Sequence, residues 1–336
     1  MEKKRNVRKG RRVLLSLLMI GLTGGILVTS TYAWFTANQT VTVSEINVNV
    51  AASNGIQVST DGINWKTVIS NDDITGATTT YPSAVNQLPT GANTLSPVST
   101  IGEIDPTTGF LKMFTGAIDS KEDGSYILTA DRNTETNGTT GNFIAFDLFV
   151  QVQQSTTAYL TSNSKVLANG VGTGIENAAR MAFVRQGNTE AGSAAATIQG
   201  LKASTGTETM VLWELNNDAH TAAAVSNASS NYGQVTQAGT GNLALEYYGV
   251  KAPITKLDEI ALNSKDNSFF SKVTPQISTP ATGIPSSAYS ELVTLDPGIT
   301  KLRIYMWLEG QDVDCENYAS GGSVLFNVQI SSNTAA

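Results

Sequence analysis

The sequence predicts an all-β protein with a minor α content, built as an antiparallel β-sandwich or jelly roll. Two observations support this fold class: the apolar runs are short and rich in Val, Ile, Phe and Tyr, and the segments between them are rich in Ser, Thr, Asn and Gly. We expect those polar segments to be long loop insertions. The clearest predicted strands are residues 41–52, 55–69, 142–154, 179–186, 210–215, 243–250, 301–310 and 323–331.

The N-terminal segment has the features of an export signal. Its first 12 residues contain seven basic residues and one acidic residue, and a long uncharged apolar run follows. The small residues Thr31 and Ala33 fit a signal peptidase, so we expect residues 1–33 to be a signal peptide, cleaved between Ala33 and Trp34. The alternative is an uncleaved membrane anchor, because Val13–Phe35 is long enough to cross a bilayer.

The remaining chain, residues 34–336, is predicted to be a single secreted domain with a strongly acidic composition. The whole chain has 21 basic and 28 acidic residues, so removal of the signal leaves 14 basic and 27 acidic residues and a net charge of about −13. Such a chain repels nucleic acid, which excludes a phosphate-binding role. We expect a secreted or cell-surface protein that contacts the membrane only through its N-terminal segment.

The first two predicted strand regions carry local signals. In residues 41–52 the apolar alternation slips by one residue between Val43 and Ile46, which indicates a β-bulge. In residues 55–69 the dipeptide Asp61-Gly62 separates two alternating arms, a pattern typical of a tight hairpin turn.

The last two predicted strands are expected to form a C-terminal hairpin connected by the acidic loop EGQDVDCENYASGG. In the first of them, side chains alternate between two faces. One face is core, and the other is either a second packing layer, which we favour, or a contact surface. The core face holds Leu302, Ile304, Met306 and Leu308, and the other holds Arg303, Tyr305, Trp307 and Glu309.

Helical signals are few. The segment GTGIENAAR predicts a turn or two of helix that leads directly into a strand, and a second short helix is predicted near Lys256–Asn263. The polar turn Gln186-Gly187-Asn188 predicts the start of an insertion that covers residues 186–241 and contains one strand, residues 210–215.

The sequence predicts no enzymatic activity and no cofactor. A zinc peptidase of the common kind needs two imidazoles one helical turn apart, and a Ser-His-Asp triad would have to use His220, the one histidine, without a nucleophile elbow. A carboxylate pair for glycoside hydrolysis stays open, because such partners meet only in the fold. The one cysteine, Cys315, lies between acidic residues and is predicted to be a buried or pairing thiol.

An acidic loop near the C-terminus offers the one metal hypothesis. Carboxylates at alternate positions suit calcium, although the loop lacks the spacing and the central Gly of an EF-hand. A solvated acidic hairpin loop is the interpretation that we favour. The carboxylates are those of Glu309, Asp312, Asp314 and Glu316.

Four features at the start of the chain resemble the TasA and camelysin family of exported bacterial proteins. They are Gly24-Gly25, Tyr32-Ala33, Trp34-Phe35 and the alternating strand Val41–Val50. The similarity covers about the first fifty residues. The chain departs from the family pattern directly after the aromatic pair, where Thr36-Ala37-Asn38 replaces a common acidic residue.

The resemblance implies processing by a dedicated signal peptidase, secretion, and assembly of jelly-roll subunits into extracellular fibres of a biofilm matrix. A strand at the very N-terminus of the mature chain can complete the sheet of a neighbour as readily as its own. We expect homopolymers that form by donation of this strand. The predicted assembly residues are Trp34, Phe35, Val41, Val43, Ile46, Val48 and Val50.

Two alternatives stay open. The strand can pair within its own domain, with Trp34 and Phe35 serving only in recognition by the peptidase. The protein can also be a monomeric secreted or membrane-anchored adhesin, which holds glycan or host protein through its long loops or through the face with Tyr305 and Trp307.

Overall fold

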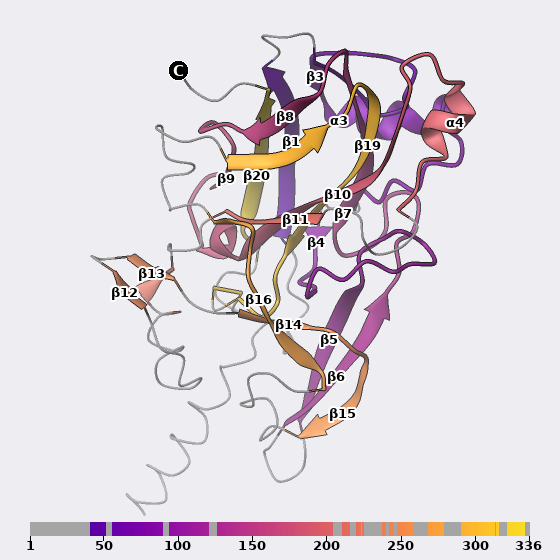
Figure 1. Cartoon of the computed structure of the whole chain (residues 1–336). Helices are drawn as coiled ribbons and strands as arrows, with labels where there is room; N and C mark the ends of the chain where they lie inside the picture. The colour runs from indigo at the N-terminus through magenta and orange to yellow at the C-terminus, as the bar shows by residue number, and fades with distance from the viewer. Residues whose placement is uncertain are drawn as a thin grey trace, which may run out of the picture.

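A computed structural model shows that the described part of the chain is mostly β, with only short helices (Figure 1). This confirms the all-β prediction. The structure describes residues 41–51, 56–89, 94–120, 126–203, 210–215, 220–222, 224, 237–239, 242–244, 247–258, 268–278, 290–312, 314–315 and 321–332. Within these residues no helix is both long and apolar enough to cross a bilayer.

The first large sheet has six strands in the order β17-β11-β10-β19-β7-β2. Its pairs are antiparallel except for β17 and β11, which run parallel. The strands are β2 (Gln57–Ser59), β7 (Ile144–Val152), β10 (Ala179–Thr189), β11 (Met210–Glu214), β17 (Ile277–Ser278) and β19 (Gly298–Leu308).

The second large sheet has seven strands, with β18-β8-β20-β1-β3 as its main path, β4 beside β1 and β9 beside β20. It contains both the first and the last of the described strands. The strands are β1 (Val41–Ala51), β3 (Val68–Ile69), β4 (Thr94–Leu95), β8 (Thr156–Leu160), β9 (Lys165–Ala168), β18 (Ser290–Leu295) and β20 (Ser323–Ser331).

The main hydrophobic core joins residues of both large sheets. Every second residue of β20, from Val324 to Ile330, is buried in it, as expected for a strand with one face toward a core. Strand β19 is buried on both faces. Tyr305 and Trp307 on its second face belong to a separate apolar cluster with Phe143 and Leu212. The predicted second packing layer is therefore confirmed.

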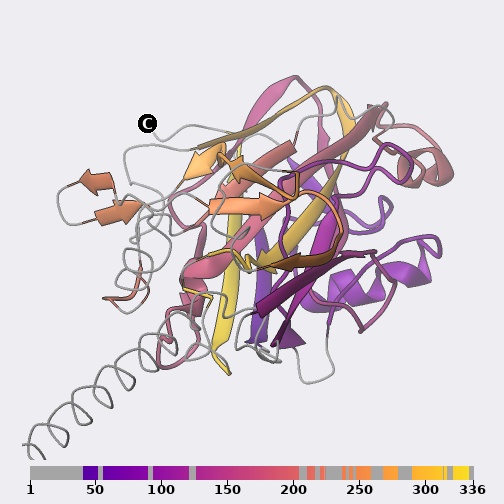
Figure 2. The ribbon, with the colours of Figure 1, turned by 90° about the horizontal axis from the view of Figure 1, so that it is seen from below.

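Smaller elements surround these sheets. The three-stranded sheet β15-β6-β5 extends away from them in Figure 1, and the hairpin β12-β13 stands apart from the main body in Figures 1 and 2. Their strands are β5 (Met113–Ser120), β6 (Tyr126–Asn133), β12 (Gln237–Gly239), β13 (Asn242–Ala244) and β15 (Ile254–Asp258). The remaining elements are β14 (Tyr247–Val250), which pairs with β16 (Phe270–Val273), and the helices α3 (Asn71–Gly76), η2 (Ala77–Thr79), η3 (Ile175–Ala178) and α4 (Ala195–Gln199).

The predicted C-terminal hairpin is wrong. Strand β19 lies in the six-stranded sheet and β20 in the seven-stranded sheet. Both edges of β19 are already occupied, one by β10 and the other by β7, so that no hydrogen-bonding edge is left for β20. The loop after Leu308 therefore carries the chain from one sheet to the other.

Other local predictions have mixed outcomes. The chain turns at Asp61-Gly62, where Gly62 has a φ of 71°, but the predicted tight hairpin is wrong. Val58 and Lys66 exchange two backbone hydrogen bonds of 2.8 Å as a single bridge across residues 59–65, and the flanking strands β2 and β3 lie in different sheets. The short helix before the strand at Ala179 is confirmed, as η3.

Two further predictions are wrong. Residues 186–188, the predicted turn, lie inside β10, where the register shifts between Arg185 and Gly187 as in a bulge. A bulge tolerates the polar and flexible residues that the sequence pattern attributes to a turn. Residues 256–258 of the second predicted helix belong to β15, and the rest of that helix lies outside the described residues.

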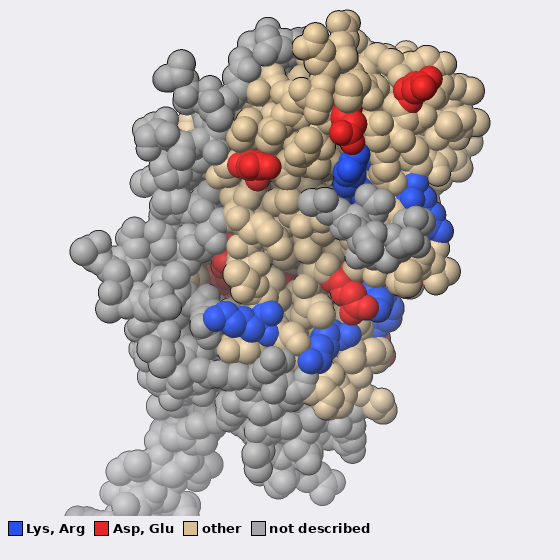
Figure 3. Space-filling view, viewed as in Figure 1, with Lys and Arg blue, Asp and Glu red and all other residues tan. Residues whose placement is uncertain are grey.

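Charged side chains are sparse on the face shown in Figure 3. Blue and red residues are scattered among uncharged ones, without an extended area of one sign among the described residues of that face.

Candidate functional site

Strand β1 is the element on which the assembly hypothesis rests. It runs parallel to β20 from the pair Thr42 and Ser323 to the pair Ala51 and Ser331. On its other side it pairs antiparallel with β3 and β4. The register with β20 shifts between Val43 and Glu45, which confirms the predicted bulge. In this structure β1 thus completes the sheet of its own chain.

The predicted assembly residues are divided by what the structure describes. Five of them lie in β1, namely Val41, Val43, Ile46, Val48 and Val50. The aromatic pair Trp34 and Phe35 lies outside the described residues, as does the predicted cleavage site between Ala33 and Trp34.

The acidic loop after β19 is not the solvated loop that the sequence pattern predicts. Glu309 and Asp314 are completely buried, and Asp312 is 7 % exposed. The loop turns inward because each carboxylate has a donor there: Trp307 Nε1 donates to Glu309, the backbone of Asp314 donates to Asp312, and the backbone of Thr221 donates to Asp314. Glu316, the fourth predicted ligand, lies outside the described residues.

His220 joins this loop from a distant part of the chain. Its Nδ1 lies 2.7 Å from Asp314 Oδ2, and its side chain is only 2 % exposed. Burial raises the pKa of Asp314. Burial lowers the pKa of His220, but the hydrogen bond to Asp314 and the nearby carboxylates outweigh this effect, so that the pKa of His220 is raised. The two groups therefore titrate as a pair and not independently.

Arg180 connects the loop to the six-stranded sheet. Its Nη2 lies 2.6 Å from both Glu214 Oε1 on β11 and Asp312 Oδ2, and the guanidinium is completely buried. Burial raises the pKa of Glu214 despite this contact, and burial raises the pKa of Glu309 to about 7. We call His220, Asp312, Asp314, Glu309, Glu214 and Arg180 the acidic cluster.

A second buried network crosses the six-stranded sheet. The Arg303 guanidinium forms an ion pair with Glu135, and its Nη1 lies 2.7 Å from Asp147 Oδ1. The Nζ atom of Lys301 lies 3.1 Å from the other oxygen, Asp147 Oδ2. The Lys301 ammonium also lies over the rings of Tyr81 and Phe149. Burial raises the pKa of Asp147, but its two cationic partners outweigh this effect and hold that pKa below its usual value. The network supports stability and offers no solvent-accessible reactive group.

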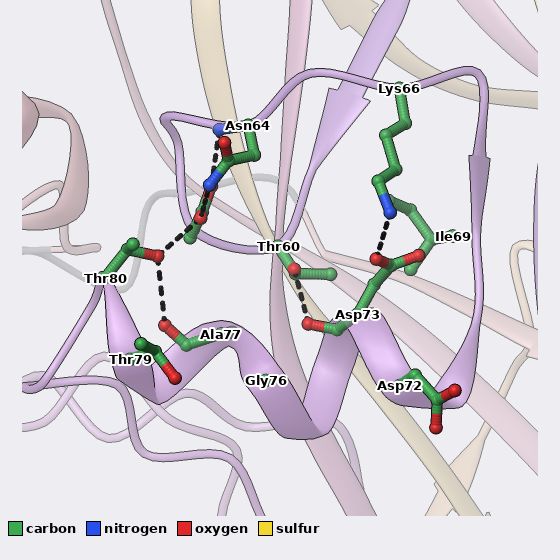
Figure 4. Close-up of a pocket in the computed structure, with 11 residues that line it drawn as sticks. Thr60, Asn64, Lys66, Ile69, Asp72, Asp73, Gly76, Ala77, Thr79 and Thr80 are labelled. Carbon is green, nitrogen blue, oxygen red and sulfur yellow. Dashed lines mark hydrogen bonds and ion pairs between the residues drawn. The ribbon is translucent and has the colours of Figure 1, made fainter.

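A polar cavity of about 430 Å³ opens between the Asp61 turn and the helices α3 and η2 (Figure 4). Its groups largely bind one another. Asp61 accepts hydrogen bonds from the backbone of Ile63 and Asn64 and from Thr80 Oγ1, and Lys66 pairs with Asp73. Burial raises the pKa of Asp61, but these donors outweigh it and hold the pKa far below its usual value.

Several residues of the two networks escape sequence reasoning. Arg180, Asp147 and Arg303 each stand in an apolar strand that is buried on both faces. A charged residue in such a run signals a buried partner, because an unpaired charge is too costly to bury. That signal identifies both members of the Arg303–Asp147 pair, but it does not indicate that Asp312 is a partner of Arg180.

Comparison with protein-family models, curated proteins and solved structures finds no match to this chain. Functional conclusions therefore depend on the residues and on their geometry.

Proposed function

We propose that the chain is a secreted structural subunit of an extracellular surface or biofilm-matrix fibre, of the TasA and camelysin type. We further propose that the two large sheets form a jelly-roll sandwich, and that subunits assemble when β1 of one copy completes the sheet of the next. The N-terminal signal and the aromatic pair after it support export and processing by a dedicated signal peptidase.

The observation that carries this proposal is the place of β1. Its partners β3, β4 and β20 all come from later parts of the chain, and residues 52–55 are its link to the elements that follow. A strand attached at one end can be exchanged with that of an identical neighbour, because the donated strand makes the same hydrogen bonds in either chain. The self-completed sheet of this structure is then the closed form of the subunit.

Electron microscopy of two versions of the protein tests the proposal. One version begins at Trp34 and the other after Val50. Fibres from the first and none from the second are expected. Monomers from both, under conditions of secretion, would contradict assembly by β1.

The second candidate is a monomeric adhesin or binding module. The face with Tyr305 and Trp307 is buried and is not available for it. The polar cavity beside Asp61 is the observation that favours this candidate. Self-association distinguishes the two candidates: a binding module should bind glycan or host protein as a monomer, whereas a fibre subunit should assemble.

A further inference from the structure

We propose that Lys301 and Asp147 react with each other to form an intramolecular isopeptide bond, which joins strands β19 and β7 covalently. The proposal is independent of fibre assembly. In the structure the two side chains form an ion pair in which Lys301 Nζ lies 3.1 Å from Asp147 Oδ2, and both are buried. They stand on one face of adjacent antiparallel strands, since Lys301 is the register partner of Phe149, two residues after Asp147.

The reaction needs no reagent from outside the pair. A lysine ammonium and a carboxylate together contain all the atoms of one amide and one water molecule. The bond between Nζ and Cγ forms, the bond between Cγ and Oδ2 breaks, and two protons move from Nζ to Oδ2, which leaves as water. No oxidant, reductant or activating group is consumed, because holding the amine and the carboxyl group in contact replaces chemical activation.

The Tyr81 hydroxyl offers a path for the protons. It accepts a hydrogen bond from Lys301 Nζ at 3.0 Å and donates one to Asp147 Oδ2 at 3.0 Å, so it can take a proton from the first atom and give one to the second. The other proton has a direct path from Nζ to Oδ2. Asp147 begins as a carboxylate, so both protons come from Lys301. The carbonyl oxygen of Gln199, 2.9 Å from Nζ, holds the amine in place.

Arg303 lies where it can stabilise the intermediate. Its Nη1 donates to Asp147 Oδ1 at 2.7 Å, and Oδ1 is the oxygen that stays in the amide. When Nζ adds to Cγ, negative charge collects on this oxygen. A buried guanidinium fixed beside it therefore acts as an oxyanion hole.

The balance of buried charge favours the product. Two cations, Lys301 and Arg303, face two carboxylates, Asp147 and Glu135. The amide removes one charge of each sign and leaves Arg303 paired with Glu135, so the network stays neutral. A buried ion pair carries a desolvation cost that a neutral amide does not carry. Burial also lowers the pKa of Lys301, which favours the neutral amine that attacks.

The bond would supply a covalent link that the cysteine content of the chain does not allow. The chain has one cysteine, Cys315, so no disulfide can join two of its own strands. Strands β19 and β7 are neighbours inside the six-stranded sheet, each with a further strand on its other side. A cross-link between them would hold the sheet together where an exported protein meets proteases and mechanical load.

Mass spectrometry of the intact, denatured chain tests the proposal. The secreted chain should be lighter, by one water molecule, than its sequence counted from the observed N-terminus. Lys301→Met removes the amine and keeps an apolar side chain beside the rings of Tyr81 and Phe149, and this variant should have its full sequence mass. The matched control Lys66→Met breaks a more exposed Lys–Asp pair, the one with Asp73, and should still lack one water.

Peptide mapping of the unchanged chain covers the case in which Lys301→Met fails to fold. After digestion with trypsin, tandem mass spectrometry should find one branched peptide that joins the segment around Lys301 to the segment around Asp147. Full sequence mass for the unchanged chain, linear peptides in which both side chains are free, or a lost water that maps to another residue would each overturn the proposal.

Discussion

Arg303 on β19 and Asp147 on β7 are register partners on adjacent antiparallel strands, and their ion pair of 2.7 Å is almost completely buried. Replacing Asp147 by Ala would leave two buried cations, Arg303 and Lys301, without this carboxylate. We expect a loss of about 3–5 kcal/mol in the free energy of unfolding, measured by urea denaturation followed through tryptophan fluorescence.

The matched control for this prediction is another Arg–Asp pair. Arg185 Nη2 lies 2.5 Å from Asp296 Oδ2, but the side chain of Asp296 is 50 % exposed. Asp296→Ala should therefore lower the free energy of unfolding by less than about 1 kcal/mol. Equal losses in the two variants would show that burial does not determine the strength of these pairs.

The carboxylate of Asp61 makes the stability of its turn dependent on pH. The pKa of Asp61 is lower in the folded state than its usual value of 3.8. The ionised carboxylate therefore stabilises the fold at pH values above 3.8, and this stabilisation is lost as the pH falls from 3.8 toward the lower pKa of the folded state. Asp61→Asn should reduce the free energy of unfolding by about 2 kcal/mol at pH 6. The difference from the unchanged chain should shrink between pH 5 and pH 2, and a constant difference would contradict this explanation.

The register of β1 and β20 offers a test of strand donation that keeps every residue of β1 in place. Asn47 and Asn327 are partners in this register. Cysteines at both positions, with Cys315 replaced by Ser, should join separate chains in assembled fibres, and non-reducing gels should show a ladder of covalent multimers. Self-paired subunits would instead give covalent monomers alone, and such monomers recovered from fibres would contradict donation.

The control for this experiment places the second cysteine at Gln329. That residue is the partner of Asn49, so a cysteine there lies two positions out of register with Asn47. It should cross-link much less in either arrangement, because a disulfide requires closely spaced Cα atoms.

Gly298 at the start of β19 should tolerate no side chain. Its φ is 110°, and a Cβ atom would lie 2.2 Å from the carbonyl oxygen of Thr189 on β10. Gly298→Ala should lower the free energy of unfolding by more than about 2 kcal/mol through this strain. Gly192, around which a Cβ would meet nothing within 4 Å, is the matched control, and Gly192→Ala should leave the melting temperature nearly unchanged.

Local features of this fold follow from the sequence because their causes are local. The bulge after Val43 and the short helix before Ala179 are both encoded within a few residues, and both are confirmed. The predicted pairing of β19 with β20 fails because it depends on β7 and β10, which reach β19 from distant parts of the chain. No pattern within residues 301–331 contains that information.

The candidate sites show the same limit. Composition alone makes the loop around Asp312 look solvated, since acidic residues usually remain exposed. Its burial depends on Arg180, which lies 132 positions earlier. Likewise, His220 stands in a polar segment without any motif, and its pairing with Asp314 emerges only in the folded chain.

The parallel pairing of β1 with β20 has a consequence for how the molecule reaches its native state. Strand β1 cannot form its longest pairing until Ser323–Ser331, nearly three hundred residues later in the chain, has been synthesised. Such distant contacts give a high contact order, which slows folding and extends the time during which unpaired strand edges are exposed. The seven-stranded sheet should therefore close late, and a nascent chain that lacks β20 should remain open to chaperones and proteases.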